Sequence, residues 1–240
     1  GIWWWTTDRW LLGATALLTP AVQAVAGNLI EPSLRLPPGD RATVALTLDA
    51  CPGAFDERIA RVLAENAIPA TIFLTSLWMN YNPTGLAFLL AHRDLFSLQN
   101  HGSRHLPAVL GARPVYGLTP ARTLDAIRGE VEAGAAAVPA VSGDVPKWYR
   151  GAAALYSPEA LAPIRAMGFG IAGFSLSADE GASLSAAAVA ARIAKARAGD
   201  VIIGHINQPK RPSGAGIAAG IDALKNQGMG FVRLPDQIAM

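Results

Sequence analysis

The sequence predicts an α/β fold with a mainly parallel sheet, closed into an incomplete (β/α) barrel. From residue 31 onward, short hydrophobic runs typical of strands alternate with segments of helical periodicity. Roughly seven strands and six helices suit such a barrel. A dinucleotide-binding sheet is disfavoured, because no G-x-G-x-x-G motif follows the first of these strands.

Composition narrows the class of protein further. The chain has 240 residues, of which 51% are hydrophobic and 16% charged, and this excludes intrinsic disorder. A net charge of +2, with basic residues spread along the chain, gives no electrostatic case for nucleic-acid binding. The single cysteine, Cys51, excludes an intrachain disulfide. No repeat of 20–50 residues indicates a solenoid or propeller.

Residues 1–26 resemble a secretory signal peptide. The run from Trp10 to Ile30 carries no charge, Pro20 interrupts it, and Ala24-Val25-Ala26 is spaced like an A-x-A cleavage site. An ordinary N-terminal helix and an uncleaved membrane anchor remain alternatives. We therefore expect an exported protein, periplasmic or extracellular, attached to a membrane only if this segment is retained. Residues 27–240 are expected to form one barrel domain.

The first half of the chain predicts three strands and three helices. Ile59, Val62 and Leu63 have helical spacing, and Pro69 follows that helix. The predicted elements are strands over 43–49, 70–75 and 95–99, helices over 55–67 and 85–91, and a helix opening at Thr119-Pro120. The stretch 134–146, rich in Ala, Val and Pro, is expected to be a loop.

The second half continues the alternation. Its predicted elements are an extended run over 147–150, a helix from Ser157 to Gly168, a strand over 169–175, a helix from Ser185 to Arg197, a strand over 201–205, a helix over 215–227 and a strand over 231–234. Ionisable side chains gather just past the strand ends: Asp49, His101, His105, Arg150, Asp179 and His205. In (β/α) barrels the catalytic residues come from that rim.

His101 and His105 form an H-x-x-x-H motif. On a helical turn both rings share one face and can reach one metal ion, and a carboxylate such as Asp49 completes a ligand set suited to zinc. Surface or capping roles remain open for the two histidines, and Asp49 can also cap a turn. His205 after an apolar strand is also typical of a core histidine. Cys51 is close enough to ligate, yet a small buried thiol is the more ordinary interpretation.

Several ordered motifs resemble the polysaccharide deacetylase family, the NodB homology domain of family 4-like carbohydrate esterases. They are TLDACPG (47–53), FDERIARVLAENAIPATIFLT (55–75), HGSRH (101–105), WYRGA (148–152), FSLSAD (174–179), GDVIIGH (199–205) and IDALKNQGMGFVRL (221–234). The resemblance spans roughly residues 41–236. It implies a distorted (β/α)7 barrel and metal-dependent removal of acetyl groups from N- or O-acetylated polysaccharide, such as cell-wall or chitin-like glycan.

The resemblance also implies roles for these residues. His101 and His105 would hold a divalent metal, zinc or else cobalt or nickel, and Asp49 would be the base that activates water. His205 would protonate the leaving group. Arg150 would orient Asp49, and Asp179 would tune His205.

Three positions depart from the family pattern. Ala50 replaces the second aspartate, the family's third protein ligand, so either Asp49 itself or an extra water becomes the candidate for that position. Gly102 replaces a Ser or Thr, and Gly151-Ala152 replaces two prolines. The alternative function is therefore a catalytically silent barrel that binds glycan. A metal-dependent hydrolase of non-sugar C–N bonds would share the same site, and the sequence leaves the acetyl position and the oligomeric state open.

Overall fold

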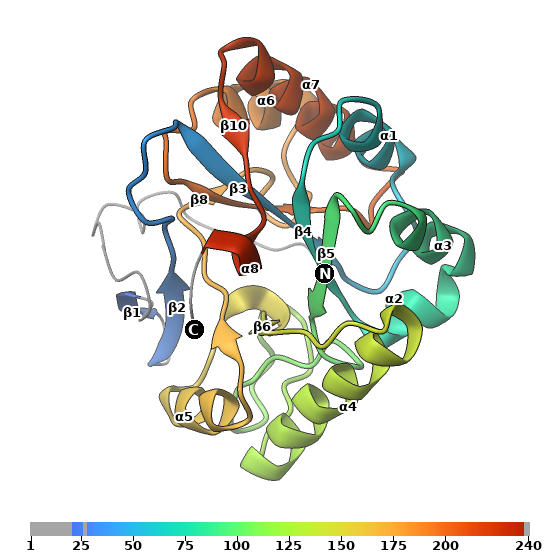
Figure 1. Cartoon of the computed structure of the whole chain (residues 1–240). Coiled ribbons are helices and arrows are strands. Elements are labelled where there is room, and N and C mark those ends of the chain that lie inside the picture. The colour runs from blue at the N-terminus through green and yellow to red at the C-terminus, as the bar shows by residue number, and fades with distance from the viewer. Residues whose placement is uncertain (1–20, 26–27, 238–240) are drawn as a thin grey trace.

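A computed structural model describes residues 21–25 and 28–237 (Figure 1). Within them, seven parallel strands form a curled sheet in the order β7-β6-β5-β4-β3-β9-β8, and β10 pairs with β3 beside this path. The predicted fold class, a distorted (β/α)7 barrel, is confirmed. The strands are β1 (Ala21–Val25), β2 (Leu29–Ser33), β3 (Thr43–Ala50), β4 (Ala70–Leu74), β5 (Phe96–Asn100), β6 (Trp148–Tyr149), β7 (Gly170–Ile171), β8 (Leu176–Ser177), β9 (Val201–His205) and β10 (Gly230–Phe231).

The helices, except for the short last one near the centre of the barrel, surround the outside of this sheet in Figure 1. They are α1 (Glu57–Glu65), α2 (Ser76–Tyr81), α3 (Pro83–Ala91), α4 (Leu124–Ser142), α5 (Pro158–Ala166), α6 (Ala186–Ala194), α7 (Ser213–Asn226) and α8 (Leu234–Gln237). Four of them begin at a side chain that accepts a backbone N–H of the first turn: Asp56, Thr75, Thr123 and Ser185. The caps explain where these helices start.

The sheet separates two apolar layers. Alternate residues of β3, among them Leu46, Leu48 and Ala50, pack in the outer cluster with the helices. Ala45 and Cys51 belong to the inner cluster that fills the barrel. The period of two along a strand thus places the odd-numbered residues of β3, including Asp49, toward the interior. This parity decides which side chains reach the site.

The predicted loop over 134–146 is wrong, because α4 continues to Ser142. Alanines favour helix, and Val131, Gly134 and Val138 supply a buried face at helical spacing that outweighs the interior Pro139. Gly143, with φ of 75°, ends the helix in the left-handed region. The helix also begins at Leu124 with Thr123 as its cap, rather than at Thr119-Pro120.

The predicted strand over 169–175 is divided between β7 and β8. The chain between them lies against the end of β2, and Leu34 N–H donates to Phe174 O at 3.3 Å. Earlier in β2, Ile30 exchanges backbone hydrogen bonds with Tyr156, which precedes α5. At Gly173 an added Cβ would lie 2.4 Å from Pro32 O, so only glycine permits this approach. Residues 28–36 therefore cover the edge of the barrel between β7 and β8.

The remaining differences lie near the ends of the chain and after β4. Helix α2 and strands β1 and β2 were not predicted, whereas the last predicted strand is only β10 before the short α8. The signal-peptide interpretation falls mostly on residues outside the described part. Within it, Ala21–Val25 pairs antiparallel with Leu29–Ser33. No helix among the described residues is long and apolar enough to cross a membrane.

Candidate active site

The polar residues predicted at the strand ends gather in one buried region. All six are nearly or completely inaccessible to solvent: Asp49, His101, His105, Arg150, Asp179 and His205. Asp49 is opposite His205 in the β3–β9 register, and Arg150 N–H donates to Asn100 O just after β6. Parallel strands explain this convergence, because their carboxyl ends meet at one rim.

Arg150 holds Asp49 with every nitrogen of its guanidinium occupied. Nη1 donates to Asp49 Oδ1 at 2.8 Å and to Thr47 Oγ1 at 2.9 Å. Nε and Nη2 donate to the carbonyl oxygens of Ala172 and Gly173, and the Phe73 ring lies 4.5 Å from Cζ. Burial opposes ionisation of Asp49, but Arg150, then His101 and His205, outweigh it and lower the pKa of the carboxyl group. Asp49 is therefore a buried carboxylate.

Asp179 holds His205. His205 Nδ1 lies 3.0 Å from Asp179 Oδ1, and the His205 backbone N–H donates to Asp179 Oδ2 at 2.9 Å. Because a carboxylate only accepts, Nδ1 carries the proton and Nε2 is the nitrogen that remains for the site. Burial lowers the pKa of His205, but the charge and hydrogen bond of Asp179, with a smaller contribution from Cys51, raise it well above the ordinary value.

Cys51, His101 and His105 form a group able to hold a metal ion. Their donor atoms lie within 4.8 Å of one another, and no other such group occurs among the described residues. Cys51 Sγ is 3.4 Å from His101 Nε2, and the two histidine rings meet edge-on with centroids 5.1 Å apart. Two imidazoles and a thiol are ligands that zinc accepts. The histidines were predicted together; Asp49 lies beside the group, with Oδ2 3.8 Å from His101 Nε2.

Charges within and beside this group favour the thiolate of Cys51, and although burial lowers the pKa of His101, Asp49 and Cys51 outweigh it and raise that pKa. Burial raises the pKa of the Cys51 thiol, but His105 and His101 outweigh it and hold that pKa well below its usual value. His101 Nδ1 lies 2.5 Å from the carbonyl oxygen of Arg150, which fixes Nδ1 as the donor and turns Nε2 toward Cys51.

Glu130 on α4 holds the segment that carries the two histidines. This segment is not the expected helical turn: His105 has φ of 59°, in the left-handed region. The buried Glu130 carboxylate accepts the backbone N–H groups of Arg104 at 3.0 Å and Leu106 at 3.1 Å. Sequence reasoning missed Glu130, although an acidic residue three positions after Ile127 on the apolar stripe was a signal.

Gly102 is explained by the same carboxylate. It has φ of +84°, and a Cβ built there would lie 2.5 Å from Glu130 Oε2. Asn100 Oδ1 accepts the Gly102 N–H at 2.8 Å, and its Nδ2 donates to Val131 O. A larger residue at position 102 would therefore displace Glu130 from the loop.

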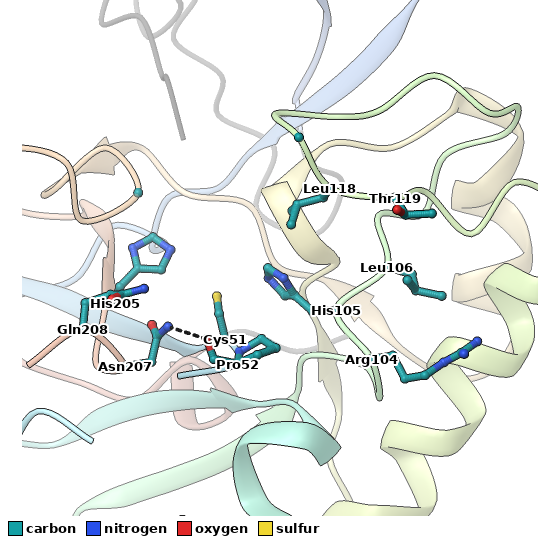
Figure 2. Close-up of a pocket in the computed structure, with 12 residues that line it drawn as sticks. Cys51, Pro52, Arg104, His105, Leu106, Leu118, Thr119, His205, Asn207 and Gln208 are labelled. Carbon is teal, nitrogen blue, oxygen red and sulfur yellow. Dashed lines mark hydrogen bonds between the residues drawn. The ribbon is translucent and has the colours of Figure 1, made fainter. Parts of the chain in front are cut away.

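A cavity of about 380 Å³ opens over the site, and Cys51, His105 and His205 line it together with Leu106, Leu118 and Asn207. Figure 2 shows the Cys51 sulfur between the rings of His105 and His205. The thiol, both rings and an apolar wall thus face one space. A substrate group entering it would meet all three polar side chains.

The sequence of this chain matches a known protein family. The model of the family described as "Polysaccharide deacetylase" matches residues 37–172, more than half of the chain. The chain belongs to the polysaccharide deacetylase family. The match includes Asp49, Cys51, both site histidines and Arg150, and the resemblance read from the sequence motifs is confirmed.

Solved structures show the same fold as this polysaccharide deacetylase family member. The Bc1960 peptidoglycan N-acetylglucosamine deacetylase is 21% identical with a TM-score of 0.70, covering 86% of this chain and 92% of that one. PdaA of Bacillus subtilis, a family 4 carbohydrate esterase, is 18% identical with a TM-score of 0.66, over 85% and 84% of the two chains. A CE4 family pseudoenzyme of Bacillus anthracis is 17% identical with a TM-score of 0.67, over 87% and 69%.

One curated protein shares a short segment. Eighteen residues are 94% identical to a probable peptidoglycan glycosyltransferase FtsW of Caulobacter vibrioides. The match covers 8% of this chain and spans only 5% of that protein's length. It is too short to bear on the fold or the site.

Proposed function

We propose that this protein is an exported metal-dependent hydrolase that removes acetyl groups from N- or O-acetylated polysaccharide. One observation carries the proposal. A carboxylate held by an arginine, Asp49–Arg150, and a histidine held by a carboxylate, His205–Asp179, lie beside a group of metal donors. Of these residues, Cys51, His105 and His205 line one cavity. Base, acid and metal donors in one buried region suit hydrolysis.

The donor group fits a divalent ion, with His101 and His105 as ligands in the proposal. Zinc is the first choice, and cobalt or nickel can replace it. When bound, the ion supplies a Lewis acid and lowers the pKa of water at its open position. Both imidazoles belong to segments that are already fixed by Arg150 O and Glu130, so binding needs little reorganisation.

Asp49 acts as the base in this proposal. Arg150 occupies Oδ1, whereas Oδ2 faces His101, so one oxygen anchors the carboxylate and the other remains beside the donor group. Asp49 accepts a proton from the attacking water, whose oxygen bonds to the acetyl carbon. Arg150 keeps the carboxylate ionised until that step.

His205 acts as the acid. Asp179 stabilises its protonated form, and Nε2 donates that proton to the leaving nitrogen or oxygen as its bond to the acetyl carbon breaks. The products are acetate and the free amine or hydroxyl. The proton taken by Asp49 replaces the one given by His205, so the reaction is a balanced hydrolysis.

The polysaccharide substrate and the export are supported by features outside the catalytic groups. One structural relative is a peptidoglycan N-acetylglucosamine deacetylase, and residues 1–26 have the pattern of a signal peptide. Acetylated chito-oligosaccharides, peptidoglycan and acetylxylan are therefore the substrates to test.

The test is acetate release by the purified full chain with Zn²⁺, Co²⁺ or Ni²⁺ added. We expect release from at least one of these substrates, loss of release with a chelator, and recovery when metal returns. The variants Asp49→Asn and His205→Gln should retain substrate binding while release falls. If no metal binds and no acetate appears from any substrate, the proposal is wrong.

A catalytically silent barrel that binds glycan is the second candidate. Ala50 favours it, and one structural relative is described as a pseudoenzyme. This candidate predicts that the wild type binds chito-oligosaccharide without turnover and that His205→Ala leaves the binding unchanged. Any turnover abolished by Asp49→Asn excludes it.

A further inference from the structure

We infer that Cys51 is the third protein ligand of the metal site. The inference rests on the proposed function, because it assigns one more residue to that site. A buried thiol within 4.8 Å of two histidine donors completes a three-ligand set. Three protein ligands leave a fourth position for water or substrate, as in catalytic zinc sites.

Strand parity directs Cys51, rather than Ala50, into the site. Ala50 packs with the outer cluster between sheet and helices. Cys51 follows it and belongs to the inner cluster, on the same side as Asp49. Ala50, which stands where the family has a metal ligand, therefore packs among apolar side chains. The next residue, Cys51, supplies a donor atom in its place.

The thiol is already close to a ligating distance. Two ligands of one tetrahedral zinc, a sulfur and a nitrogen, lie about 3.6 Å apart when computed from typical bond lengths. Cys51 Sγ and His101 Nε2 are 3.4 Å apart. In the absence of metal the same contact is a hydrogen bond, so one arrangement serves both states.

The backbone on each side of Cys51 is anchored. Thr75 Oγ1 donates to Ala50 O at 2.9 Å, and Asn207 Nδ2 donates to Pro52 O at 3.4 Å. Asp49 O accepts the Ile206 N–H at 3.1 Å. The segments that follow β4 and β9 thus hold the turn after β3, and the Cys51 sulfur is kept in a fixed position.

Asp49 has a different partner. Its Oδ1 is bound by Arg150, and it lies outside the group formed by Cys51 and the histidines. With Cys51 as ligand, Asp49 is released from ligation and remains the base. The two functions that the sequence assigned to one carboxylate are divided between Asp49 and Cys51.

The exchange has a chemical consequence. On binding, the thiol gives its proton to solvent and ligates as the thiolate, which carries the same single negative charge as a carboxylate. A thiolate is a softer ligand than an oxygen, so the site should prefer Zn²⁺ and Co²⁺ over Mg²⁺, Ca²⁺ and Mn²⁺. The preference of the site for Zn²⁺ and Co²⁺ would thus depend on Cys51.

The absorption spectrum of the Co²⁺-loaded full chain tests the inference. A thiolate ligand gives a sulfur-to-cobalt charge-transfer band in the near ultraviolet, and the sequence has one cysteine, so the band is assigned without ambiguity. We expect the band in the wild type and its absence in Cys51→Ser and Cys51→Asp. Zn²⁺ affinity of Cys51→Ser should fall by more than the roughly 10- to 100-fold that losing an outer partner costs.

The two variants separate ligation from folding. Cys51→Asp restores a charged ligand and should bind Co²⁺ more tightly than Cys51→Ser, still without the band; far-ultraviolet circular dichroism checks that both fold. The inference is overturned if the wild type binds Co²⁺ without the band, or binds no metal. Acetate release measured on the same samples separates the claims: release without the band contradicts only the ligand, and the band without release contradicts only the function.

Discussion

Arg150 carries a fully buried positive charge that the fold pairs with one carboxylate and three neutral oxygens. Such a charge stabilises the protein only while its partners remain. The same residue orients the base and, through its carbonyl oxygen, the His101 ring. Stability and activity are therefore coupled at this side chain.

Replacing Arg150 with Met should leave Asp49 buried without its partner. Removing one member of a buried pair costs about 3–5 kcal/mol. We expect that loss in urea unfolding, with acetate release abolished. Arg61→Met is the matched control, because Arg61 pairs with Glu57 on the surface and such pairs contribute about 0.2–0.5 kcal/mol. Equal losses in the two variants would contradict the account.

The raised pKa of His205 makes stability depend on pH. Asp179 stabilises the protonated ring, so this contribution is fully present below about pH 6.5, the pKa in the unfolded chain. It is lost as the pH rises through the folded-state pKa, which is higher. Urea unfolding of the metal-free protein should show this decline on the alkaline side.

The variant Asp179→Asn should flatten that decline, because it removes the charge that raises the pKa of His205. His92→Gln is the control, since His92 is the C-cap of α3 and precedes the amino end of β5, whereas the site lies at the carboxyl ends of the strands. An unchanged pH dependence in Asp179→Asn would show that another group is responsible.

At the scale of elements, α4 positions the histidine segment through Glu130. Its carboxylate accepts backbone N–H groups that no regular element satisfies in residues 101–106. A helix that was partly assigned to a loop by its sequence thus supports the site. The Ala-rich stretch and Pro139 give no clear helical pattern in the sequence. The helix is stabilised instead by tertiary contacts that bury Val131 and Val138.

Glu130→Gln should weaken Zn²⁺ binding by about 10-fold, as loss of an outer partner does. Glutamine has one acceptor oxygen in place of two, so the loop is held less firmly. Glu132→Gln on the exposed face of the same helix is the control. Zinc affinity measured by competition with a chelator checks this. Glu130 has no positioning role if both variants bind zinc like the wild type.

Most strands and helices could be predicted because their signals are local. The apolar run of β3, the Ser185 cap and the spacing of Ile59 and Leu63 each specify an element without distant partners. That the predicted polar residues gather in one place followed from one further rule, namely that the carboxyl ends of parallel strands meet at a rim. The sequence offered Cys51 both as a possible ligand and as a small buried thiol, and favoured the thiol, because the side on which Cys51 lies depends on the parity at the end of β3. Glu130 was not predicted at all.

At the scale of the whole molecule, residues 28–36 complete the barrel. Leu34 and Leu36 are buried in the inner cluster, and backbone hydrogen bonds join this segment to residues 156, 174 and 199. The gap between the two end strands of the sheet, β7 and β8, is therefore covered by residues 28–36, which precede β3, the first strand of the barrel. This segment belongs to the barrel domain proposed to begin at residue 27.

A chain of residues 27–240 should therefore unfold cooperatively with the midpoint of the full chain, within a few degrees. A chain of residues 37–240 should lose at least about 4 kcal/mol, because Leu34 and Leu36 leave the core and each such loss costs about 2–5 kcal/mol. Thermal unfolding compares the midpoints of the two shortened chains with that of the full chain, and urea unfolding compares their free energies of unfolding. A stable 37–240 chain would contradict the role of this segment.

The central claim, that this buried centre removes acetyl groups with the help of a metal, is tested most directly by acetate release from acetylated chito-oligosaccharide. The account predicts release by the Zn²⁺-loaded full chain, none by the stripped chain, and a loss of at least about 100-fold in both Asp49→Asn and His205→Gln, as expected when a general base or acid is removed. Release that is unaffected by the chelator, or undiminished in both variants, would contradict it.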